Sequence, residues 1–268
     1  MMRFINRLLH GSREKFERDL QAWGLTGRQA LVIAATPIII VLAMTAMVPF
    51  SELFVWVTAE DSLMEWLQFL LLLATSLTFT RLGIGLIRSR GRGVGMLCLI
   101  VALGTFFVAG EEIAWGQRIF GWATPETLEA VNYQNETTLH NIGSAHQAFI
   151  YAVMLGGMYG ALVPLFCWAL WNERPRSLLS YLLVPPLCLV PAFFLPFGYR
   201  FSRLVSPIDA RYPHLIFYIT KFSEVTELCL YFGLVVFAWL NLRRLHQEYP
   251  SPLAQYHSGE SSARSSAQ

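Results

Sequence analysis

Six long apolar runs dominate this sequence, and charged clusters separate them. A run of roughly 20 residues is long enough to cross the hydrocarbon core of a bilayer as a helix. An open sheet cannot span lipid, because the backbone groups at its edge would find no hydrogen-bond partner there. The runs cover about residues 29–50, 63–80, 93–112, 149–171, 178–198 and 218–240. We therefore predict an all-α fold, a polytopic helical membrane bundle of about six transmembrane helices over residues 29–245.

The composition supports this fold class and excludes others. Charged residues make up 14% of the chain, whereas a soluble domain carries about 25%. A disordered chain would be far less apolar, and no nucleic-acid partner is expected at a formal net charge of +2. The four cysteines all lie inside the apolar runs, so we predict free thiols. Four prolines in the fifth run, Pro185, Pro186, Pro191 and Pro196, predict a kinked or broken helix there.

The basic residues predict the orientation of the bundle. With the N-terminus in the cytoplasm, fifteen of the twenty Lys and Arg residues fall on the cytoplasmic side. This asymmetry follows the positive-inside rule, and six spans then place the C-terminus in the cytoplasm as well. We predict residues 1–28 as a cytoplasmic amphipathic segment and residues 246–268 as a disordered cytoplasmic tail.

Acidic side chains gather in the outer halves of the runs and near their outer ends. Inserting a charged group costs roughly 2.5–3.5 kcal/mol at the centre of a membrane helix. Such groups persist where they face the inside of a bundle and find partners. Glu224 and Glu227 are three residues apart, which puts both carboxyl groups on one helix face. Lys221 is their obvious local partner, so a salt-bridge network and a working site are both open interpretations. The acids concerned are Glu65, Glu111, Glu112, Glu224 and Glu227.

Histidine, amide and arginine side chains lie on the same side of the membrane, in the outer loops. Carboxylate and imidazole groups suit general acid–base catalysis and zinc, which needs three protein ligands and a water. Two interpretations of the arginines in the last outer loop stay open: they pair with these acids, or they bind a phosphate or carboxylate, such as a lipid headgroup offers, with two parallel hydrogen bonds. The predicted catalytic residues are Glu111, Glu112, His140, Glu224 and Glu227. The predicted metal ligands are Glu112, His140, His146 and His214, and the predicted substrate-binding residues are Glu65, Gln117, Asn141, Arg200 and Arg203.

One stretch carries a resemblance to a known family. The residues GEEIAWGQRIFGW at 110–122, followed by NETTLHN at 135–141, resemble the signature of a family of uncharacterised bacterial integral membrane proteins. The resemblance covers about a third of the chain and implies a protein of the bacterial inner membrane. It implies no activity. A weaker likeness to membrane ceramidase-type hydrolases, which combine outer histidines and acids, is an analogy only.

The standard catalytic motifs are absent, since the chain has no H-E-x-x-H, G-x-S-x-G or P-loop sequence. Any site must therefore assemble in space from several runs. The leading hypothesis is a membrane-embedded, metal-dependent hydrolase or transferase with a divalent metal, zinc by preference, acting on a lipid or lipid-linked substrate. Two alternatives stay open: a proton- or cation-coupled transporter, and a non-catalytic membrane scaffold.

Overall fold

The computed structural model describes residues 2–59, 62–89, 92–130, 132, 136–139, 142–171, 177–206 and 213–248. Within these ranges the chain forms helices and turns and no strand. The helices are α1 (Met2–Ala22), α2 (Gly27–Met47), α3 (Ser51–Thr58), α4 (Leu63–Ser89), α5 (Arg92–Glu112), α6 (Gln117–Phe120), α7 (Glu126–Glu129), α8 (Gly143–Leu170), α9 (Leu178–Leu183), α10 (Val190–Val205) and α11 (Pro213–Glu248). Two short 3-10 turns, η1 (Ala114–Gly116) and η2 (Leu187–Leu189), precede α6 and α10.

Six helical segments are long and apolar enough to cross a membrane. They are Gly27–Met47, Ser51–Ser89, Arg92–Glu112, Gly143–Leu170, Leu178–Val205 and Leu215–Glu248. The described helices of the second segment are α3 and α4, and residues 60–61 between them lie outside the described part of the chain. The prediction of an all-α bundle with about six transmembrane helices is confirmed, and the chain is a multi-pass membrane protein. The last helix is longer than predicted. Its 36 residues span about 54 Å at 1.5 Å per residue, well beyond the roughly 30 Å of a hydrocarbon core.

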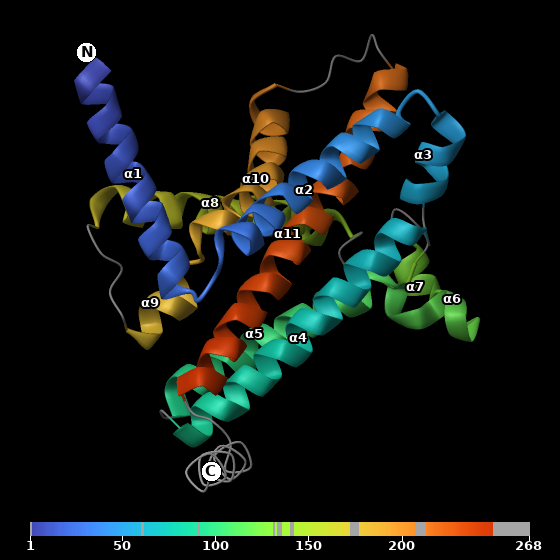
Figure 1. The fold of residues 1–268 in the computed structure, drawn as a ribbon. Coiled ribbons are helices and arrows are strands. Elements are labelled where there is room, and N and C mark those ends of the chain that lie inside the picture. The colour runs from blue at the N-terminus through green and yellow to red at the C-terminus, as the bar shows by residue number, and fades with distance from the viewer. Residues whose placement is uncertain are drawn as a thin grey trace, which may run out of the picture.

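Two close helix contacts organise the bundle. Helices α4 and α5 form a hairpin that packs against α11, and α10 packs against α8 (Figure 1). A Cβ atom on Gly95 would lie 2.6 Å from the carbonyl oxygen of Gly83, so these glycines let α4 and α5 approach closely. A Cβ atom on Gly160 of α8 would lie 2.3 Å from Cγ of Phe193 on α10. Both contacts depend on the absence of a side chain.

The fifth span is broken, as its prolines predict. Helix α9 ends at Leu183, and α10 begins at Val190 after the turn η2. The backbone N–H of Leu187 in this break donates to Oδ2 of Asp19 on α1, at 2.9 Å. Asp19 is only 9% exposed, so the N-terminal helix supplies a hydrogen bond that the broken span lacks.

The predicted N-terminal segment is a helix whose end packs into the bundle. Trp23, just after α1, contacts Tyr181 and Phe237 edge to face, with ring centroids 5.0 and 6.1 Å apart. Thr26 then caps α2 in a reciprocal pair with Gln29. At the far end of the chain, Arg244 donates to the carbonyl oxygen of Ala22. The end of α1 and the end of α11 therefore lie together.

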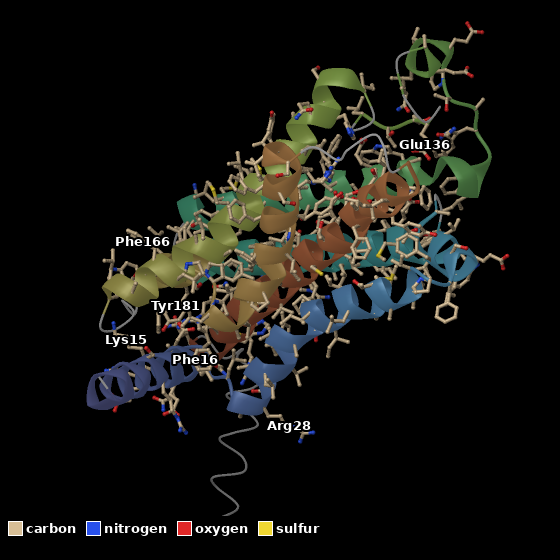
Figure 2. All side chains as sticks on the ribbon, turned by 90° about the horizontal axis from the view of Figure 1, so that it is seen from above. Lys15, Phe16, Arg28, Glu136, Phe166 and Tyr181 are labelled. Carbon is tan, nitrogen blue, oxygen red and sulfur yellow. The ribbon has the colours of Figure 1, made fainter. Side chains whose placement is uncertain are left out.

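The segment between α5 and α8 lies at the opposite end of the bundle. Figure 2 shows Glu136 of this segment far from Lys15 of α1. The predicted disordered tail falls largely on residues 249–268, which lie outside the described part of the chain. The two ends of the bundle thus differ. One holds the end of α1 together with the end of α11, and the other holds the short helices α6 and α7.

Candidate functional site: a carboxylate centre

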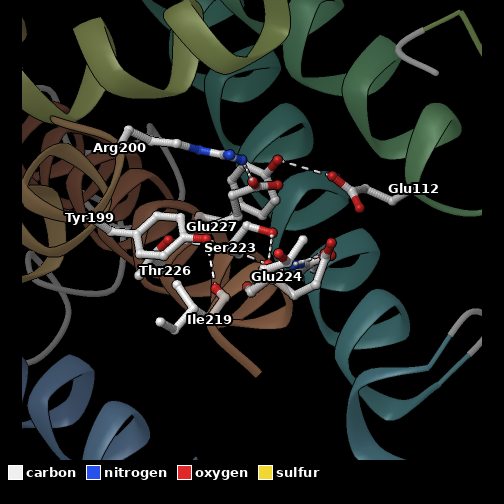
Figure 3. Close-up of polar contacts among 11 residues, drawn as sticks. Glu112, Tyr199, Arg200, Ile219, Ser223, Glu224, Thr226 and Glu227 are labelled. Carbon is white, nitrogen blue, oxygen red and sulfur yellow. Dashed lines mark hydrogen bonds and ion pairs between the residues drawn. The ribbon is translucent and has the colours of Figure 1, made fainter. Parts of the chain in front are cut away.

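Helix α11 presents two glutamates to the inside of the bundle. Glu227 is 4% exposed, and its Oε1 forms an ion pair and hydrogen bond with the Arg200 guanidinium of α10 (Figure 3). Glu224, one turn earlier, is only partly exposed. It accepts a 3.3 Å hydrogen bond at Oε2 from Nε2 of Gln68 on α4. The same Nε2 atom donates to the backbone carbonyl of Glu224 at 2.9 Å.

A third helix adds a third carboxyl group. Glu112, the last residue of α5, accepts a 2.9 Å hydrogen bond from the hydroxyl of Tyr231 on α11. Figure 3 shows Glu112 and Arg200 approaching α11 from opposite sides. The negative charges of Glu227, Glu224 and Glu65 all act on the Glu112 carboxyl, with Glu227 acting most strongly. We call this set the carboxylate centre: Glu65, Gln68, Glu112, Arg200, Glu224, Glu227 and Tyr231.

The centre has more acidic than basic groups. It holds four carboxyl groups and one guanidinium, that of Arg200, which pairs with Glu227, and the nearby Arg203 adds a positive charge that acts on Tyr199. Lys221, the predicted local partner of Glu224, makes no ion pair within the described ranges. Carboxyl groups gathered in one place inside a helical bundle favour positively charged partners. The centre is therefore suited to hold protons, a cation or the cationic part of a ligand.

Glu111, next to Glu112, makes a different set of contacts. Its Oε1 accepts from Nε1 of Trp115 at 2.7 Å, and its Oε2 accepts from the backbone N–H of Leu139 at 2.6 Å. Glu111 is 4% exposed. It thus fastens the segment after α5 to the helix end. These contacts give Glu111 a structural task, and its predicted catalytic role stays a prediction.

The chain turns sharply between Glu111 and α6. Ala114, Trp115 and Gly116 have φ angles of 45°, 54° and 78°, in the left-handed region that residues other than glycine rarely adopt. Gln117 then links two parts of the segment. Its Nε2 donates to Oγ1 of Thr124 at 2.8 Å, and its Oε1 accepts from the backbone N–H of Thr137 at 2.7 Å. Gln117, a predicted substrate-binding residue, therefore links two parts of the segment between α5 and α8.

Exposed tryptophans mark the level of the centre relative to the membrane. Trp56, Trp66 and Trp115 are 65%, 40% and 38% exposed. Tryptophan is enriched at the boundary between lipid and water. Glu65 directly precedes Trp66, and Glu112 lies three residues before Trp115. The centre thus lies near the headgroup level, at the end of the bundle that carries α6 and α7.

The structure brings some of the predicted site residues together and leaves others elsewhere or outside its described part. The centre brings together Glu65, Glu112, Glu224, Glu227 and Arg200, and Arg203 lies partly buried on the same helix as Arg200. Partly buried His146 lies in the first turn of α8. His140 and Asn141 lie outside the described residues, as does the side chain of His214. No group of three or more His, Cys, Asp or Glu side chains that could hold a metal ion occurs in the described ranges, so the metal set stays a prediction.

Sequence reasoning missed two members of the centre and one neighbour. Tyr231 follows Glu227 by four residues and Gln68 follows Glu65 by three, so helical spacing on one face could have found both. Tyr199 precedes Arg200 and donates from its hydroxyl to the carbonyl oxygen of Ile219 at 2.7 Å, which ties α10 to α11 (Figure 3). No pattern in the sequence points to that contact.

Comparison with protein families, with curated proteins and with solved structures finds no match for this chain.

Proposed function

We propose that the protein is a membrane-embedded enzyme, a hydrolase or transferase, that acts on a lipid or lipid-linked substrate. One observation carries the proposal: Glu112 with Tyr231, and Glu224 and Glu227 with Gln68 and Arg200, meet near the headgroup level of the bundle. Acidic groups held close together supply both a proton donor and a proton acceptor. A headgroup is the part of a lipid that reaches this level.

Each group has a role in this proposal. Glu112 is the proton-transfer group, because its carboxyl is held by the Tyr231 hydroxyl and lies among other acids. Glu227 positions Arg200, which is placed to bind an anionic phosphate. In the alternative form of the proposal, a divalent metal bound by Glu112, His140, His146 and His214 would activate a water for hydrolysis, and Glu112 would then be a ligand rather than the proton-transfer group. The acid–base role of Glu112 belongs to the form without that metal.

The location of the protein is part of the same proposal. The positive-inside asymmetry, with fifteen of twenty basic residues on one side, supports cytoplasmic termini and a centre on the outer face. The GEEIAWGQRIFGW stretch supports membership of the bacterial membrane protein family that it resembles and thus an inner-membrane location.

The buried surface below the centre favours an enzyme over a transporter. A coupled transporter needs a polar route across the bundle. Beyond Tyr231, α11 buries Phe237, Ala238 and Leu240 in the apolar core. The amide of Asn241 is used locally, since its Nδ2 donates to the carbonyl of Phe237 at 3.1 Å. An apolar stretch of α11 therefore lies between the polar centre and the other end of the helix.

The test is lipid turnover by purified protein in vesicles made from total lipids of bacterial inner membranes, which include lipid-linked intermediates. Mass spectrometry of the lipids should show a product with the wild type. Glu112→Gln should reduce the rate about 100-fold or more, because a general acid or base contributes about 10²–10⁴-fold. Glu52→Gln is the matched control, since Glu52 is exposed on α3.

Two additions to the same assay test the role of a metal. Adding a chelator, and then zinc, tests whether a metal takes part. A folded wild type that changes no lipid under any of these conditions contradicts the enzyme proposal. Equal rates for Glu112→Gln and the wild type would remove Glu112 from the mechanism. Proton-driven uptake by the same vesicles would instead support the transporter.

A further inference from the structure

The carboxylate centre contains a buried hydrogen-bond acceptor that has no partner. Gln68 is fully buried, at 0% exposed. Its Nε2 faces the carbonyl and the carboxylate of Glu224, and both of these are acceptors, so the orientation of the amide is fixed. Its Oε1 has no hydrogen-bond partner among the described residues. A buried acceptor left unpaired lowers the stability of the fold by about 1–3 kcal/mol. A ligand that donates a hydrogen bond to this atom would remove that cost.

The centre also contains a buried donor without a partner. Nε of Arg200 is buried and makes no hydrogen bond within the described ranges. The same guanidinium already holds Glu227, and the Arg200 side chain is 14% exposed. A guanidinium can bind carboxylate and phosphate oxygens through several N–H groups at once. The unused N–H can therefore donate to a ligand, and an anionic oxygen would form the strongest hydrogen bond with it.

The two unpaired atoms flank one turn of α11. Gln68 lies against Glu224 and Arg200 against Glu227, and side chains three residues apart on a helix are neighbours. On the Gln68 side, an unpaired acceptor belongs to the same amide that holds the Glu224 carboxylate, and this pairing suits a positively charged donor. On the Arg200 side, a guanidinium offers a donor, which suits an anion. A ligand with an ammonium close to a phosphate would satisfy both.

We propose that the carboxylate centre binds a zwitterionic aminophospholipid headgroup, with its primary ammonium at Gln68 and Glu224 and its phosphate at Arg200. This inference names the substrate class for the lipid enzyme proposed above and rests on that proposal. The ammonium must carry N–H groups, because Oε1 of Gln68 accepts hydrogen bonds. A choline headgroup has the same charges but no N–H, so it leaves that acceptor unpaired. The lipid is the source of the zwitterion because the centre lies at the level of the exposed tryptophans.

The first test uses the wild-type protein alone. The protein is placed in phosphatidylglycerol nanodiscs that carry a minor amount of phosphatidylethanolamine or phosphatidylcholine, and bound lipid is measured by native mass spectrometry. One buried hydrogen bond to a charged donor should favour phosphatidylethanolamine about tenfold or more. Equal binding of the two lipids overturns the proposal. Soluble phosphoethanolamine is then added as a competitor. If it displaces the lipid at a similar concentration, the acyl chains add nothing to the affinity, and the proposal that the bound zwitterion belongs to a lipid is overturned.

Two variants separate the two halves of the headgroup. Gln68→Met removes the unpaired acceptor and should abolish the preference for ethanolamine over choline. Arg200→Lys keeps the positive charge but removes Nε and the planar fork, so it should weaken both lipids about tenfold while leaving their ratio unchanged. An unchanged ratio in folded Gln68→Met, or an unchanged affinity in Arg200→Lys, counts against the proposed placement. Melting in detergent beside Glu52→Gln reports whether each variant is folded.

The binding test is independent of turnover. Preferential binding of phosphatidylethanolamine without any product would support this inference and contradict the enzyme proposal. Turnover of a lipid without an amine, with no preference for binding ethanolamine lipids, would support the enzyme proposal and contradict this inference.

Discussion

Glu111 and Glu112 are neighbours in the sequence, but their carboxyl groups make different contacts. Glu111 holds Trp115 and the backbone of Leu139, both within the segment that follows α5. Glu112 reaches across to Tyr231 and lies among the acids of the centre. One residue along a helix is about 100° of rotation, since a turn holds 3.6 residues. That rotation separates a carboxylate that holds the segment after α5 from one that belongs to the carboxylate centre.

The contacts of Glu111 predict a stability effect at a single residue. Glu111→Gln puts an amide NH₂ in place of one oxygen, so one of the two donors, Trp115 Nε1 or Leu139 N, loses its acceptor. Hydrogen bonds to charged groups contribute about 1.5–3 kcal/mol, so the free energy of unfolding should fall by about that amount. Thermal unfolding in detergent measures the loss, and proteolysis within residues 121–142 should become faster. Exposed Glu126→Gln is the control, and identical behaviour of the two variants would contradict the structural role.

At the scale of elements, the α4–α5 hairpin depends on backbone contact. Gly83 and Gly95 face each other with no room for a side chain on either. This hairpin carries Glu65 and Gln68 at one end of α4 and Glu112 at the end of α5. The close approach of two helices therefore sets the positions of three members of the centre.

A methyl group at this contact should destabilise the bundle. In Gly95→Ala the new Cβ would lie 2.5 Å from Cγ1 of Ile87 and 2.6 Å from the carbonyl oxygen of Gly83. Overpacking of this kind costs about 1–3 kcal/mol, so denaturant-induced unfolding in detergent should occur at lower concentration. Gly104→Ala on the same helix meets nothing within 4 Å and should be neutral or slightly stabilising. Equal effects of the two substitutions would contradict the close packing.

The broken fifth span depends on another element for its stability. Asp19→Ala should leave the N–H of Leu187 without an acceptor, because the prolines have already removed the regular helical hydrogen bonds at the break. An unpaired buried donor costs about 1–3 kcal/mol. Hydrogen exchange at residues 187–190 should become faster in this variant and remain unchanged in Glu14→Ala, where the side chain is exposed. Slow exchange in both variants would mean that α1 does not stabilise the break.

The molecule as a whole is asymmetric along the membrane normal. One end joins the turn after α1 to the end of α11, through Arg243 with Gly24 and Arg244 with Ala22. The other end carries the carboxylate centre and the segment with α6 and α7. Between them lies the apolar core. Such a molecule presents different chemistry to the two sides of a membrane.

This asymmetry predicts which side each end faces. In a variant whose native cysteines are replaced, Glu129→Cys on α7 should react with an impermeant maleimide in intact bacterial cells. Glu14→Cys on α1 should react only after lysis. Both positions are exposed, so accessibility within the protein is matched. The opposite labelling pattern would invert the orientation and place the carboxylate centre on the cytoplasmic face.

The sequence by itself determined the number of membrane helices, because apolar length is set by the thickness of the bilayer. It also determined the break in the fifth span, because proline removes hydrogen bonds wherever the helix packs. Only the tertiary structure decided which acids meet. Glu112 and Tyr231 are 119 residues apart, and Gln68 and Glu224 are 156 apart. Such contacts depend on which helices are neighbours and how each is rotated, and local sequence patterns do not encode either property.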